Sequence, residues 1–162
     1  MVSVPVIAGA FVVMLLIAGG FVYFTVFSPP GEKQSIEKPL LSEGEPMAER
    51  HVAWLANEIG AYKIHASPTG EKAIFEVVVE GIIFSVTTEG GVPVVFQSAA
   101  ESPDLRITAS RAAFGKIMNS QNLSQTIASL YGSGEISIVV EKDEATLALK
   151  GYKAVYDAFA NV

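Results

Sequence analysis

The chain has 162 residues, of which 11 are Lys or Arg and 17 are Asp or Glu, giving a formal net charge of −6. Half of the residues are hydrophobic and none is cysteine. These values exclude a disordered chain and a disulfide-stapled secreted module. The acidic balance also argues against a nucleic-acid-binding protein, because such a protein needs clustered Lys and Arg to displace counterions.

The chain begins with an apolar segment, Val2 to Phe27, that contains no charged side chain. As a helix these 26 residues would be about 39 Å long, more than the ~30 Å hydrocarbon core of a bilayer requires. A cleaved signal peptide is the alternative, but it would have a basic N-terminal region and a shorter apolar run. The segment therefore predicts a single transmembrane helix within residues 1–30 that is retained as a membrane anchor.

Residues 31–45 contain four Glu, two Lys and one Pro, and few apolar side chains. This composition predicts an acidic flexible linker, because such a segment cannot build a core. Its Lys33 and Lys38 follow the anchor closely, whereas no Lys or Arg precedes the anchor. Positive charge next to a membrane helix favours the cytoplasmic side. We therefore expect a single-pass membrane protein with its soluble domain, residues 46–162, in the cytoplasm.

The soluble domain opens with helical spacing over residues 46–60 and then changes to alternating apolar residues, which are typical of half-buried strands. A two-residue turn at 80–81 pairs Val77 with Phe84, and a three-residue turn at 89–91 pairs Phe84 with Phe96. Both turns leave the large apolar side chains on one face. Pro93 lacks an amide donor, which places the third strand at the sheet edge.

The remaining pattern predicts two more strands and three helices. A strand over 104–108 precedes a helix over 111–118, for which Ser110 is a suitable N-cap. A second short helix, capped by Asn122 or Ser124, leads to a fifth strand over 136–140. One last helix is expected from Asp143 through Phe159. The fold class is therefore α+β, with one five-stranded sheet covered on one face by helices.

Catalytic and metal-binding patterns are missing from the sequence. The two histidines, His51 and His65, are not in a metal-ligand spacing, and there is no cysteine to join them. A strained nucleophile turn and a phosphate loop are also absent. The sequence therefore predicts no catalytic residue, no metal, no cofactor and no enzyme activity.

The segment PDLRITASRAAFGKIMNSQNLSQTIASLYGSGEISIVVEKDEATLALKGYKAVYDAF resembles the sterol-carrier-protein-type-two family. The elements that carry the resemblance are Pro103-Asp104, Arg106-Ile107-Thr108, Phe114 to Met118, Gly134 to Val140 and Asp143 to Leu149. With the preceding strands the resemblance covers about residues 73–159. It implies a module that binds or transfers a sterol-like, isoprenoid or fatty-acyl lipid, without universal catalytic residues.

Many large apolar side chains are expected to face the space between sheet and helices. They either fill an ordinary core, as in a scaffold or dimerisation domain without a ligand, or line an apolar cavity of at least ~300 Å³. In the second interpretation the membrane and a hydrophobic ligand are the partners, and no protein partner is identified. The predicted lipid-binding residues are Phe84, Phe96, Phe114, Met118, Ile127, Leu130, Tyr131, Leu147, Val155 and Phe159, of which the last three would close the cavity.

Overall fold

Five strands form one mixed sheet in the computed structural model, which describes residues 31–42 and 44–160. The sheet order is β3-β2-β1-β4-β5. β1 and β4 are parallel, and the other neighbouring strands are antiparallel. The strands are β1 (Phe75–Val79), β2 (Ile82–Glu89), β3 (Val92–Phe96), β4 (Leu105–Ala109) and β5 (Ile136–Val140). The predicted α+β class with a five-stranded sheet is confirmed.

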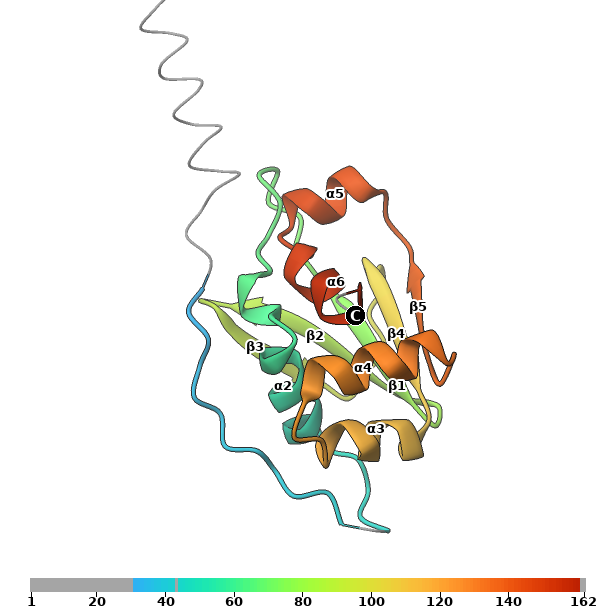
Figure 1. Cartoon of the computed structure of the whole chain (residues 1–162). Helices are drawn as coiled ribbons and strands as arrows, with labels where there is room; N and C mark the ends of the chain where they lie inside the picture. Colours follow the sequence, from blue (N-terminus) through green and yellow to red (C-terminus); the bar gives the residue numbers. More distant parts are fainter. Residues whose placement is uncertain (1–30, 43, 161–162) are drawn as a thin grey trace, which may run out of the picture. The chain divides into compact units, whose positions relative to one another are not determined.

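Helices lie over one face of this sheet (Figure 1). The predicted caps of two of them are confirmed: the Ser110 hydroxyl accepts a hydrogen bond from Ala113 N–H at 3.0 Å, and the Asn122 side chain accepts one from Gln125 N–H at 3.3 Å. The helices are α2 (Glu49–Glu58), α3 (Arg111–Met118), α4 (Leu123–Gly132), α5 (Glu144–Leu149) and α6 (Lys153–Ala160), with a 3₁₀ turn η1 (Ala61–Lys63) after α2.

The register is as predicted in one hairpin and differs in the next. Val77 lies opposite Phe84 in the β1–β2 pair, as expected from the two-residue turn. In the β2–β3 pair, however, Glu89 lies opposite Val92, so only two residues form the turn and Phe96 lies opposite Ser85. The predicted pairing of Phe84 with Phe96 is therefore wrong. Because side chains alternate, the one-residue shift turns Phe96 away from the helices.

The predicted last helix is two helices. α5 ends at Leu149 and α6 begins at Lys153, because Gly151 between them has a φ of +79°. This left-handed conformation is accessible to glycine and ends a helix. The prediction of one continuous helix through Gly151 is wrong, and the two shorter helices are free to pack in different directions.

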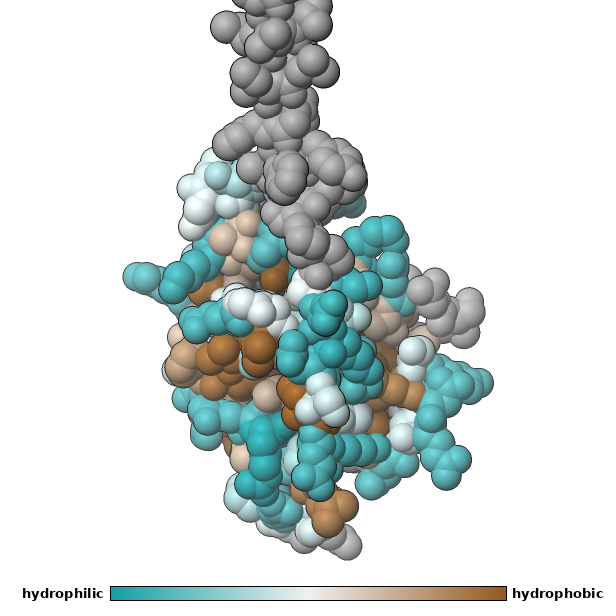
Figure 2. All heavy atoms as spheres, turned by 90° about the vertical axis from the view of Figure 1, so that its left-hand side faces the viewer, coloured by the Kyte–Doolittle hydropathy of each residue, from teal (hydrophilic) through white to brown (hydrophobic). Residues whose placement is uncertain are grey.

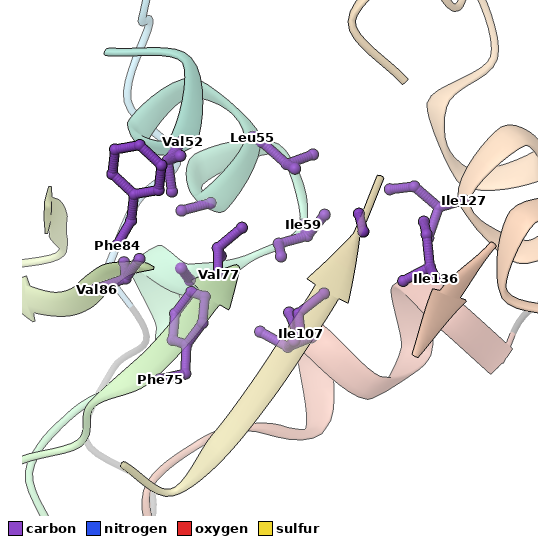
Figure 3. Packing of buried hydrophobic residues seen from close by; sticks show 14 of the residues in the cluster. Val52, Leu55, Ile59, Phe75, Val77, Phe84, Val86, Ile107, Ile127 and Ile136 are labelled. Carbon is purple, nitrogen blue, oxygen red and sulfur yellow. The ribbon is translucent and has the colours of Figure 1, made fainter. Parts of the chain in front are cut away.

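Buried side chains from both layers meet between the helices and the sheet. Figure 3 shows Val52 and Leu55 of α2 on the side of the sheet strands that carries Val77 and Phe84. On the far side of the sheet, Glu76 is also buried, and its charge is compensated by hydrogen bonds that it accepts from Ala100 N–H at 2.9 Å and from Arg106 Nε at 2.7 Å. The hydrophobic core is therefore on the helical face, and an ion pair lies on the other.

The segment predicted to be a flexible linker packs against the domain instead. Asn57 of α2 is fully buried, and its side-chain Nδ2 donates to Gln34 O at 2.9 Å. His51 is also fully buried, with its Nε2 3.0 Å from Leu40 O and its Nδ1 accepting a hydrogen bond from Ala48 N–H. Residues 31–42 therefore form a strap that supplies backbone partners to two buried side chains of α2, which sequence composition alone did not indicate.

The surface on the side of β3 and the strap is mainly hydrophilic, with separate apolar areas (Figure 2). Lys33 contributes an ion pair to Glu58 at 2.7 Å, and Lys38 lies 5.0 Å from the centre of the Trp54 ring. The predicted anchor, residues 1–30, lies outside the described residues. Within the part of the chain that the structure describes, no helix has the length and apolar character needed to span a bilayer.

Candidate functional site

Most of the predicted lipid-binding side chains are buried between the sheet and the helices. The exceptions are Phe96, which is 51% exposed after the register shift, and Tyr131, which is 44% exposed and contacts Phe159 edge-on at 6.0 Å between ring centres. The buried members of the set are Phe84, Phe114, Met118, Ile127, Leu130, Leu147, Val155 and Phe159. That these residues bind a lipid stays a prediction.

The space that these residues share is nearly filled. The cavity between the layers has a volume of about 20 Å³ and is bordered by Val77 of β1, Ile107 of β4 and Phe114 of α3, among other apolar side chains. Because one water molecule needs roughly 10–15 Å³ of accessible space, the cavity is about one water in size. The predicted interlayer cavity of at least ~300 Å³ is therefore wrong for this structure.

A larger hollow lies elsewhere, where β5 ends and α5 and α6 pack. This groove has a volume of about 540 Å³, within the roughly 300–1,000 Å³ range of small-molecule sites. Its lining side chains are Val140, Glu144, Leu147, Ala148, Tyr152, Lys153 and Tyr156. The set has a mainly apolar character, with one acidic and one basic side chain. Of the residues predicted for lipid binding, only Leu147 is in this lining.

The two charged residues of the groove lining, Glu144 and Lys153, are at exposed positions. The Lys153 ammonium is paired with Asp157 at 2.8 Å and is well exposed. Burial, followed by the nearby Glu144 carboxylate, raises the pKa of Tyr156, so its phenol stays neutral through the physiological range. The groove can therefore accept an apolar group, with polar side chains available at the rim.

A buried polar cluster lies behind the groove. The Lys150 ammonium, which is fully buried, donates to Asp104 Oδ1 at 2.6 Å and to Glu71 Oε1 at 2.9 Å. The Tyr152 hydroxyl donates to the other oxygen of Asp104, Oδ2, at 2.8 Å. Ile74 N–H also donates to Oδ2 at 2.9 Å. The cluster therefore joins the α5–α6 connection to the start of β1 and β4.

Electrostatics within the cluster favour its charged and hydrogen-bonded form. Burial lowers the pKa of Lys150, but its hydrogen bonds and ion pairs with Asp104 and Glu71 outweigh burial and leave the pKa raised. The hydrogen bond from Lys150 lowers the pKa of Glu71. Burial and the Asp104 carboxylate raise the pKa of Tyr152, so this phenol remains protonated. Every buried side-chain polar atom of the described residues has a hydrogen-bond partner, which fits a cluster that holds structure.

Sequence reasoning missed this cluster, although one signal for it was present. Lys150 follows Leu147 by three residues and therefore falls on the apolar side of the predicted last helix. A lysine on a core-facing stripe calls for a buried carboxylate, since an unpaired buried charge is costly. Nothing in the sequence indicates which of the 17 acidic residues that carboxylate is.

The two histidines lie in separate places. His51 is bonded within the strap and α2, as described above, whereas His65 Nδ1 is 2.9 Å from Ala66 O in an exposed loop. Over residues 31–42 and 44–160, no group of three or more His, Cys, Asp or Glu side chains is placed to hold a metal ion. The expectation that the chain uses no cofactor or metal stays a prediction.

No protein-family model and no curated protein match this chain. Solved structures do match, and one of them is described as "UbiJ-SCP2 Ubiquinone synthesis protein". It is 17% identical in sequence, and the match covers 65% of this chain and 90% of that chain with a TM-score of 0.38.

Proposed function

We propose that the domain binds a hydrophobic small molecule, with the apolar part of that molecule in the groove between β5, α5 and α6. The observation that supports this proposal is the groove itself, whose volume of about 540 Å³ is paired with a mainly apolar lining. Removing apolar ligand surface from water is worth roughly 25 cal/mol per Å². A sterol-like, isoprenoid or fatty-acyl lipid has the required chemistry.

The lining of the groove indicates how apolar and polar groups are divided within the ligand. Leu147 and the Tyr152 ring offer apolar contact at buried positions, whereas Glu144 and Lys153 are charged residues that remain hydrated. A ligand with an apolar body and a polar end suits this division, because its polar end stays at the rim in water. The groove, at about 540 Å³, has room for such a ligand, whereas the space between the sheet and the helices, at about 20 Å³, has not.

Photolabelling of the full chain tests the groove. A fatty acid that carries a diazirine on its acyl chain is added to the protein in native membranes, irradiated, and mapped by mass spectrometry of the peptides. We expect labelling within residues 140–156. The yield of this labelling should fall at least about tenfold in Tyr156→Lys, since losing an aromatic contact that the ligand buries costs about 1.5–3 kcal/mol.

Phe96→Lys is the matched control, because Phe96 is an exposed aromatic residue on the opposite edge strand. It should leave labelling of residues 140–156 unchanged. Label on residues 1–30 is counted separately, so lipid around the predicted anchor does not affect the result. Equal labelling of Tyr156→Lys and the unchanged chain, with both folded by circular dichroism, would contradict the proposal.

The membrane anchor and the cytoplasmic position of the domain are part of the same proposal. An anchor would keep the groove beside its lipid source and raise the effective ligand concentration. Protease added to sealed cells should leave the domain intact if it is cytoplasmic. Digestion of residues 46–162 without lysis would place the domain outside and overturn this part of the proposal.

A scaffold or dimerisation domain without a small-molecule ligand is the second candidate. It is favoured by the nearly filled space between the layers, where the cavity is about 20 Å³. This function needs no occupied groove, so the photolabelling experiment distinguishes it from lipid binding.

A further inference from the structure

The two edges of the sheet differ in how they are protected from pairing with another strand. β3 and β5 are the edge strands, and β3 contains Pro93, which lacks an amide donor. β5 has the sequence Ile-Ser-Ile-Val-Val, without proline or lysine. Proline and lysine are common devices against edge-to-edge pairing. β5 lies at the rim of the sheet in Figure 1, and it is the unprotected edge.

Hydrogen bonding to β4 shows which backbone groups of β5 point outward. Glu141 N–H donates to Asp104 O at 2.9 Å, next to the Leu105–Val140 pair, so the N–H of Glu141 points toward β4. Bonding alternates along an antiparallel ladder, and Ser137 and Val139 therefore also bond to β4. The N–H and C=O groups of Ile136, Ile138 and Val140 point away from β4, and no other described element pairs with them.

Side chains at this edge are apolar and accessible. Val139 is 49% exposed and Val140 is 44% exposed. Ile138, which precedes them in the strand, is partly buried against the core. Val140 also belongs to the groove lining. The edge therefore combines free backbone groups with apolar side chains, which is the combination that strand addition uses.

We infer that a second copy of this chain pairs with β5, antiparallel, about a two-fold axis through Ile138. In this register Ile138 lies opposite the partner's Ile138, and Ile136 lies opposite the partner's Val140. All three residues with outward backbone groups then form hydrogen-bonded pairs, and a shift in either direction leaves one of them outside. The strand is thus complementary to itself, as a two-fold interface requires.

Side-chain pairs in this register are compatible with the interface. The facing pairs on the helical side are Ile with Ile and Ile with Val, and Ser137 faces the partner's Val139 on the other side. Glu135 faces the partner's Glu141, but each of these charges has a cation in its own chain. Glu135 binds Lys116 at 2.6 Å, and Glu141 is 4.0 Å from Arg106.

The size of the contact sets the conditions under which it forms. Two five-residue strands bury less than the roughly 1,000 Å² expected of an interface that is stable in dilute solution. Confinement of the chain by its predicted anchor would raise the local concentration of the partner. The interface should therefore be sought with the full chain in its membrane.

The lack of cysteine in the chain makes disulfide trapping specific. Chains with Ser137→Cys and Val139→Cys, carrying different tags, are co-expressed and treated with a mild oxidant. The two cysteines would form a non-hydrogen-bonded cross-strand pair with Cα atoms about 4.5 Å apart, within disulfide range. We expect at least about tenfold more mixed dimer than from Val92→Cys with Phe96→Cys, two exposed positions on the protected edge strand β3.

Adding Ile138→Pro to both cysteine chains tests whether pairing uses the backbone. The N–H of Ile138 points outward and does not bond to β4, so its loss in proline should leave the fold intact by circular dichroism. The amount of mixed dimer should fall to the level given by the Val92→Cys and Phe96→Cys control on β3. Three results would each overturn the inference. They are mixed dimer no more abundant than in the β3 control, mixed dimer undiminished by Ile138→Pro, and trapping of a different protein in place of the second copy.

Discussion

Replacing Lys150 with Met should destabilise the domain by about 3–5 kcal/mol, the usual cost of removing one partner of a buried ion pair. The Lys150 ammonium is fully buried and bonds to Asp104, which is also fully buried. Met fills a similar volume but leaves the Asp104 carboxylate without its cation. The free energy of unfolding is measured by urea denaturation of the full chain in detergent micelles, with fluorescence of the single tryptophan, Trp54, as the probe.

Lys153→Met is the control, because the Lys153 side chain is 82% exposed and its ion pair with Asp157 is within one helix. An exposed pair of this kind contributes about 0.3–0.5 kcal/mol. If Lys150→Met were no more destabilising than Lys153→Met, the cluster behind the groove would not be the structural support described above.

The parts of the fold that the sequence predicted are those fixed by local patterns. In the β1–β2 hairpin, the alternation of apolar residues and a two-residue turn together determine that Val77 lies opposite Phe84. Ser110 and Asn122 cap helices because their side chains accept from backbone amides three residues later. Neither feature requires knowledge of distant residues.

The failures come from single residues whose effect is decided by their surroundings. In the structure, Gly90 and Gly91 both have positive φ and form a two-residue turn, with Glu89 opposite Val92. The predicted three-residue turn, which includes Glu89, pairs apolar residues equally well but shifts the register of β3 by one residue. Phe96 changes face as a result. At Gly151 a helix and a break are both compatible with the local sequence, and packing against Lys63 and His65 accompanies the break.

The polar cluster behind the groove was harder to predict than the fold, because its parts are distant in the sequence. Lys150 and Asp104 are 46 residues apart, and no local pattern selects one carboxylate for one ammonium. Whether a cavity is present between the sheet and the helices also depends on how much space the side chains leave unfilled after packing. Alternating apolar side chains show which residues face inward, but not whether they fill the space. The groove arises instead from the change of direction between α5 and α6.

That change of direction gives the second large expected effect. Gly151→Ala should destabilise the domain by about 2–5 kcal/mol, because two penalties add. The first is the left-handed conformation, which costs a residue with a Cβ roughly 1–2 kcal/mol. The second is overpacking, which costs about 1–3 kcal/mol. A Cβ at Gly151 would be 2.5 Å from the Lys63 carbonyl oxygen, which belongs to the backbone and cannot turn aside.

Gly134→Ala separates the two penalties. Gly134 has a φ of +78°, nearly the same as the +79° of Gly151, but a Cβ added there would have no atom within 4 Å. This variant should lose only about 1–2 kcal/mol, from backbone conformation alone.

Both variants are compared by urea unfolding of the full chain and by photolabelling of residues 140–156. Because the contact with Lys63 holds α5 and α6 in their relative directions, we expect Gly151→Ala to be less stable than Gly134→Ala and to label less in the groove. Equal losses of stability in the two variants would mean that the approach of Gly151 to Lys63 does not fix the joint.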